Sequence, residues 1–256
     1  GGGIQCGWTA ALKKSYAPEI NSVGWYTGGT PSNLTALVEK INGGPFAGYI
    51  AGGLGGVIST YPDVKKYTDK VFTKQAQKDL DFPKKHCQGD ITSHFHFKNF
   101  YDKSFSTVGK RFLYEPVIQN TLNELTMGVN PEFTPDTPVL MVHGISDEVA
   151  PYEAAHTTYK SWCKNGADVE FVNFANPVSA HGVTTVTSSV PGFLWIRDRL
   201  QGKPVQSGCR ESKNYDVGIN SHALGEDFES ALGLLKGLLG DKIGPNDQYL
   251  KDALHK

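Results

Sequence analysis

A continuous apolar run stands out in the second half of the chain. Residues 138–144 read Pro-Val-Leu-Met-Val-His-Gly, a pattern typical of a strand buried on both faces of a parallel sheet. The following residues predict a helix over 152–165, a second strand over 168–174 and a final helix that ends near Leu200. Strand, loop and helix in repetition indicate an α/β fold with right-handed crossovers.

The first residues carry a different pattern. Three glycines lead into apolar positions that share one helical face, namely Ile4, Trp8, Ala11 and Leu12. This spacing predicts a helix that starts at or just before residue 1. A short buried strand is predicted over 21–26, and Gly-Gly-Thr-Pro at 28–31 marks a turn and a domain boundary.

Residues 32–129 predict a helical insertion, with helical periodicity over 32–41 and 62–82 around a glycine-rich stretch. Gly52–Val57 superficially resembles a phosphate-binding loop, but neither phosphate motif matches at full spacing, so close helix packing in a cap is the preferred interpretation. The predicted organisation is an amino-terminal core segment at 1–31, a cap or lid at 32–129, the remaining core at 130–209 and a tail or flap at 210–256. An apolar stripe between Leu224 and Leu239 in the tail predicts packing onto the body, with docking to a lipid surface as the alternative.

Composition narrows the classes of function. The 256 residues carry a formal net charge of -1, which argues against a nucleic-acid partner. No apolar run approaches the roughly 18–20 residues of a membrane span. Four cysteines allow three disulfide pairings, and the sequon at Asn33 would accept a glycan if the chain is secreted.

The candidate chemistry lies on two loops that follow the two predicted strands. The first contains Asp147 and the second contains His181. Functional groups gather at the carboxyl ends of parallel strands, and an acid that orients a histidine is the arrangement of a catalytic imidazole. The alternatives are that Asp147 caps a helix and that His181 is a structural loop residue. Glu148 is the second candidate for the acid, and His143 is expected to pack or to support the site.

In α/β-hydrolases the chain order is nucleophile, acid, histidine, so the nucleophile is expected upstream of Asp147. A serine immediately before Gly1 would make Gly1 and Gly2 the last two positions of a G-x-S-x-G turn. The backbone N–H of Gly1 would then donate to the oxyanion.

Several motifs together resemble the secretory lipases of yeasts and moulds, of the lipase A type. They are residues 1–12, 15–19, 43–48, 143–151, 180–181 and 208–209, so the similarity spans about residues 1–209. The resemblance implies an α/β-hydrolase fold with a helical cap over an acyl-binding tunnel, Asp147 as the acid of the triad and His181 as its base. It also implies a Cys163–Cys209 disulfide and a partner for Cys87 in a preceding segment, whereas Cys6 has no counterpart. No metal or organic cofactor is implied.

The expected function is therefore that of a secreted serine lipase acting on lipid esters, with triacylglycerols as the leading substrate and a lipid–water interface as a possible partner. An esterase or acyltransferase for smaller esters, or a lipid-binding relative without turnover, are the alternatives. Because the nucleophile would precede Gly1, residues 1–256 are expected to need an amino-terminal segment to fold and react.

Overall fold

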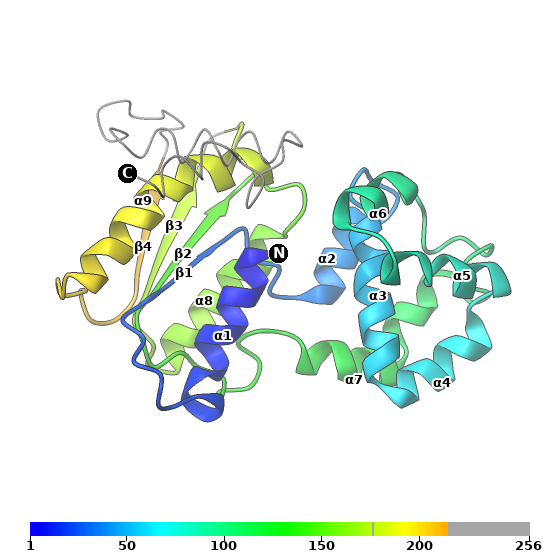
Figure 1. Ribbon diagram of the computed structural model, residues 1–256, viewed down its shortest axis with the longest axis horizontal. Coiled ribbons are helices and arrows are strands. Elements are labelled where there is room, and N and C mark those ends of the chain that lie inside the picture. Colours follow the sequence, from blue (N-terminus) through cyan, green and yellow to red (C-terminus); the bar gives the residue numbers. More distant parts are fainter. Residues whose placement is uncertain (176, 215–256) are drawn as a thin grey trace, which may run out of the picture.

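The computed structural model describes residues 1–175 and 177–214. It has two lobes, one built on a twisted sheet and one made of helices (Figure 1). The sheet lobe combines segments from both ends of the described chain, and the helical lobe is inserted between them. The predicted α/β fold is confirmed.

Four parallel strands form the described part of the sheet, in the order β1-β2-β3-β4. They are β1 (Trp25–Gly28), β2 (Val139–Gly144), β3 (Val169–Phe174) and β4 (Arg210–Asn214). All six residues of β2 are buried, as the apolar run predicts. Because the strands are parallel, their carboxyl ends lie along one edge of the sheet.

Helices cover both faces of this sheet. On one face, α1 (Gly2–Tyr16) and α8 (Tyr152–Lys164) pack on a buried cluster, whose members include Ala10, Ala11, Val139, Met141, Trp162 and Phe171. On the other face, α9 (His181–Leu200) places Trp195 against Leu140 and Val142. Burying alternate strand residues against separate helices accounts for the apolar run Val139–Val142 in β2.

The cap has its own hydrophobic core. Its helical elements are α2 (Leu34–Ile41), α3 (Gly48–Thr60), α4 (Pro62–Val71), α5 (Lys74–Asp79), η1 (Phe82–Lys84), α6 (Gln88–His94), η2 (Gly109–Tyr114) and α7 (Pro116–Glu124). Five phenylalanines contact one another through the centre, namely Phe72, Phe95, Phe100, Phe105 and Phe112. Offset and edge-on aromatic pairs of this kind contribute beyond the area that they bury.

Two elements differ from the sequence-based expectation, whereas the glycine-rich stretch packs as a helix of the cap, as expected. The first strand runs over Trp25–Gly28 rather than 21–26. The helix predicted over 62–82 is interrupted near Thr73, whose hydroxyl accepts the Ala76 N–H at 3.1 Å and so begins α5. The glycine-rich stretch forms α3, in which a Cβ on Gly48 would lie 2.7 Å from the Ile91 carbonyl oxygen, so this glycine permits close packing against α6.

Strand β4 was not predicted, because the sequence Arg-Glu-Ser-Lys-Asn is polar and its first four positions are exposed. Pairing with β3 forms it, and a disulfide between Cys163 and Cys209 fastens its start to the end of α8 with a Cα–Cα distance of 5.8 Å. This is the pair that the family resemblance implies. Cys6 is half-buried, Cys87 is exposed, and both are free thiols here.

The apolar stripe predicted between Leu224 and Leu239 lies outside the described residues. Among residues 1–175 and 177–214, no helix has the length and apolar character that a membrane crossing requires.

Candidate active site

The two candidate loops meet at the carboxyl edge of the sheet. Asp147 lies in the loop that follows β2, and His181 is the first residue of α9, in the segment that follows β3. His181 Nδ1 lies 2.8 Å from Asp147 Oδ2. Two residues that are 34 positions apart in the sequence are therefore brought into direct hydrogen-bonding contact.

Asp147 is buried, with 1% of its surface exposed, and its carboxylate is fully engaged. Oδ1 accepts the backbone N–H groups of Val149 at 2.9 Å and Ala150 at 2.7 Å, while Oδ2 faces His181. Burial alone would raise the pKa of the Asp147 carboxyl, but the hydrogen bond and charge of His181 outweigh it and hold the pKa below its ordinary value. The carboxylate is thus ionised and aimed by its own loop.

The His181 side chain is partly accessible, with 26% exposed. Because Nδ1 faces a carboxylate, Nδ1 carries the proton and donates it to Asp147, which leaves Nε2 as the basic nitrogen. Glu148, the alternative acid, accepts the backbone N–H of His181 at 2.8 Å. It therefore satisfies a free donor at the amino terminus of α9, whereas Asp147 contacts the imidazole.

Gly29 is a site residue that the sequence analysis treated only as part of a turn. Its φ of +53° lies in the left-handed region, and a Cβ there would lie 2.7 Å from His181 Cε1 and 3.3 Å from Asp147 Oδ2. Only glycine leaves room for the imidazole at this position. A Gly-Gly turn after a predicted strand was the available signal, but its distance from the site could not be read from the sequence.

The first turn of α1 lies beside the same turn. A Cβ on Gly3 would lie 2.3 Å from the Gly28 carbonyl oxygen, and Thr27 Oγ1 donates to the Gly3 carbonyl at 2.9 Å. Gly1 is exposed and caps α1, and Figure 1 shows the amino terminus at the end of the sheet to which the strands point. The turn after β1 is therefore flanked by the start of α1 on one side and by His181 on the other.

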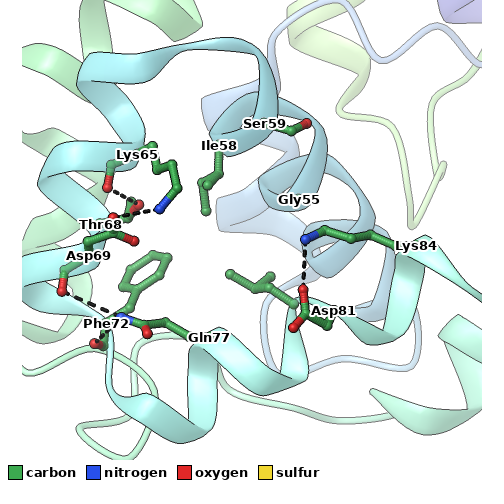
Figure 2. Close-up of a pocket in the computed structure, with 11 residues that line it drawn as sticks. Gly55, Ile58, Ser59, Lys65, Thr68, Asp69, Phe72, Gln77, Asp81 and Lys84 are labelled. Carbon is green, nitrogen blue, oxygen red and sulfur yellow. Dashed lines mark hydrogen bonds and ion pairs between the residues drawn. The ribbon is translucent and has the colours of Figure 1, made fainter.

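Two of the cavities formed by the described residues lie among the helices of the cap. One is an apolar cleft of about 60 Å³ between α2, α3 and α7, lined by residues that include Leu34, Leu37, Ile50, Leu54, Ile118 and Leu122. The other cavity has a volume of about 390 Å³ and is shown in Figure 2. Its lining combines two ion pairs, Lys65–Asp69 at 2.6 Å and Lys84–Asp81 at 2.7 Å, with the apolar side chains of Ile58 and Phe72. Neither cavity is lined by Asp147 or His181.

No group of three or more His, Cys, Asp or Glu side chains among the described residues could hold a metal ion. His86 and His94, which are close in sequence, both stack on the ring of Phe82, with centroids 3.7 and 4.0 Å away. Asn33, the glycosylation candidate, caps α2 by accepting the Ala36 N–H at 2.9 Å, and its glycosylation stays a prediction.

A parallel sheet covered by helices on both faces, with an acid in the loop after one strand and a histidine at the start of the helix after the next, defines the α/β-hydrolase class. The sequence model of the secretory lipase family matches residues 1–208, and the chain belongs to this family. The resemblance inferred from the motifs is confirmed.

Similar proteins include two secreted triacylglycerol lipases of Malassezia globosa, LIP3 and LIP2, which are 90% and 88% identical over 256 residues. The chain spans 56% of the length of each of these relatives. Candida antarctica lipase A in its closed state superposes with a TM-score of 0.76 at 26% identity, covering 89% of this chain and 54% of that one.

Proposed function

We propose that the protein containing this chain is a secreted serine hydrolase that cleaves carboxylic esters of lipids, with triacylglycerols as the substrate. The 2.8 Å hydrogen bond between His181 Nδ1 and buried Asp147 carries the proposal, because it is the geometry that prepares an imidazole to accept a proton from a nucleophile. The Malassezia relatives, which are secreted triacylglycerol lipases, support the substrate class and secretion. The Cys163–Cys209 disulfide is in keeping with an oxidising compartment.

In the proposed mechanism, a serine immediately before Gly1 attacks the ester carbonyl. His181 Nε2 accepts the serine proton and returns it to the leaving alcohol, and Asp147 stabilises the imidazolium that forms in between. The Gly1 N–H, at the amino terminus of α1, donates to the oxyanion. Water then attacks the acyl-enzyme with His181 as its base and releases the fatty acid. The closeness of the first turn of α1 to the Gly28–Gly29 turn supports this placement.

The cap supports a lipid substrate rather than a polar one. Its cleft between α2, α3 and α7 is almost entirely apolar, and apolar surface is what an acyl chain needs in order to leave water. We propose that the cap offers apolar surface of this kind to the acyl chain, with the lipid–water interface as the source of substrate.

The test uses the full-length protein with a fluorophosphonate probe and peptide-level mass spectrometry. We expect an adduct on the serine that precedes Gly1. Asp147→Asn and His181→Ala should each lower kcat for a soluble ester by about 10³–10⁶-fold without loss of the folded state.

Turnover like that of the wild type in either variant would exclude this triad. Probe labelling with a preference for short esters, and no rate increase above the solubility limit of the substrate, would indicate an esterase or acyltransferase. Ligand binding without product or adduct would indicate a lipid-binding protein without activity.

A further inference from the structure

His143 occupies a position where the strand pattern calls for an apolar side chain. It is the fifth residue of β2 and only 1% exposed. Its ring meets Tyr152 of α8 edge-on, with centroids 5.9 Å apart and an interplanar angle of 78°. A polar group buried in this way is destabilising unless it is hydrogen-bonded, so its partners identify what the residue does.

Those partners belong to the loop that carries the acid. His143 Nε2 lies 3.0 Å from the Ala150 carbonyl oxygen and 3.5 Å from Asp147 Oδ2. Both of these atoms are acceptors, so Nε2 carries a proton and donates it to Ala150. Burial lowers the pKa of the His143 imidazole, and the ring is therefore neutral beside an ionised carboxylate.

Ala150 is consequently held from two sides. Its N–H donates to Asp147 Oδ1 at 2.7 Å, and its carbonyl accepts from His143 at 3.0 Å. The same carboxylate then meets His181 through Oδ2. A continuous series of contacts thus runs from a rigid strand through His143 and Ala150 to Asp147 and His181.

We propose that His143 is a positioning residue of the catalytic pair: by holding the Ala150 carbonyl, it keeps the Asp147 carboxylate aimed at His181 Nδ1. It does not transfer protons. This inference rests on the proposed function for its kinetic consequence, but its structural consequence at His181 is independent of turnover.

The test compares two amides of different reach in the full-length protein. His143→Gln places an amide N–H near the position of Nε2 and retains the donor to Ala150, whereas His143→Asn is one methylene shorter and cannot reach. We expect His143→Asn to lower kcat for a soluble ester about tenfold or more with KM nearly unchanged, and His143→Gln to restore most of the loss. The low-field proton resonance of His181 Nδ1–H, identified by its absence in His181→Gln, should weaken in the Asn variant and persist in the Gln variant.

His156 provides the matched control. It stacks on Tyr152, at 5.5 Å between centroids, and its Nε2 lies 3.1 Å from Glu211 Oε2. Its other described ring contacts are with Tyr159 and Phe171 rather than with the loop that contains Asp147. His156→Gln and His156→Asn should leave both kcat and the resonance unchanged.

Equal kcat and equal resonances in the two folded His143 variants would overturn the proposal. A loss of kcat in the His156 variants as large as that in His143→Asn would also overturn it. If His143→Asn does not fold, an unchanged resonance in folded His143→Ser, which also lacks the reach, would overturn it. If the wild-type protein shows the His181 Nδ1–H resonance but has no esterase activity, the proposed function is wrong. The comparison of this resonance among the His143 variants would still decide the role of His143.

Discussion

The sheet lobe and the cap bury similar apolar side chains but different polar ones. Among the described residues, the buried polar side chains of the cap are hydroxyls, namely Ser32, Thr68, Ser106 and Thr121. The sheet lobe also buries an imidazole, a carboxylate and an amide at the carboxyl ends of its strands, those of His143, Asp147 and Asn173. A buried ionised group needs fixed hydrogen-bond partners. For Asp147 these partners are the backbone N–H groups of its own loop and His181. The difference supports the proposal that the sheet lobe carries the chemistry and that the cap shapes the substrate site.

Val149 contacts both lobes. Val149 donates its N–H to Asp147, while its side chain belongs to the cap's core cluster, which includes Phe112. A substitution in the core of the cap could therefore disturb Asp147 through Val149. The proposed separation of roles between the two lobes can be tested with such a substitution.

The largest effect is expected for Phe112→Ala. Phe112 is 0% exposed and packs edge-on against Phe72 at 5.1 Å, so its removal should lower the free energy of unfolding by about 3–5 kcal/mol. Phe171→Ala, at an equally buried position of the sheet lobe, is the matched control and should lose a similar amount. Denaturant unfolding measures both losses.

At denaturant concentrations below its unfolding transition, the Phe112→Ala variant should have a kcat for a short soluble ester within a few fold of the wild-type value. A folded Phe112→Ala protein that had lost this activity would show that the cap supports the chemistry through Val149, and the comparison would fail.

The second-largest effect is expected for Gly29→Ala. An alanine Cβ at φ +53° would lie 2.7 Å from His181 Cε1, so the imidazole must move and kcat should fall by about 100-fold, since misplacing a catalytic group by an ångström has this consequence. Gly43→Ala is the control, because its φ is +73° and no atom lies within 4 Å of the added Cβ.

Both glycine variants should lose about 1–2 kcal/mol of stability from left-handed backbone strain, measured by thermal unfolding, but only Gly29→Ala should lose activity. An equal activity loss in Gly43→Ala would mean that backbone strain in either lobe disturbs the site.

The sequence predicted the parts of the molecule whose local pattern matches their surroundings. β2, β3, α8 and α9 follow from an apolar run and helical periodicity, and the order of Asp147 and His181 on successive loops predicted that they meet. Gly29 and β4 could not be found in this way. Gly29 lies against the imidazole of His181 because two segments that are far apart in the sequence meet there. Strand β4 is polar and exposed, and it is held in the sheet by pairing with β3 and by the Cys163–Cys209 disulfide.

The break between α4 and α5 has a similar origin. The residues from 62 to 82 keep a helical pattern of lysines and apolar positions, but Phe72 leaves the helix to bridge Ser106 and to enter the aromatic core. Tertiary packing overrides local propensity at such a point.

The smallest effect is expected at Glu148, which the sequence offered as the second candidate for the acid after Asp147. Its carboxylate accepts the backbone N–H of His181 at 2.8 Å, at the start of α9, so Glu148→Ala removes a helix-capping contact and should cost about 0.3–1 kcal/mol of stability. The imidazole keeps its contact with Asp147, so kcat should fall less than about tenfold, against a loss of about 10³-fold or more in Asp147→Asn. Steady-state kinetics of the two variants in the full-length protein decide between the carboxylates, and a larger loss in Glu148→Ala would transfer the role of acid to Glu148.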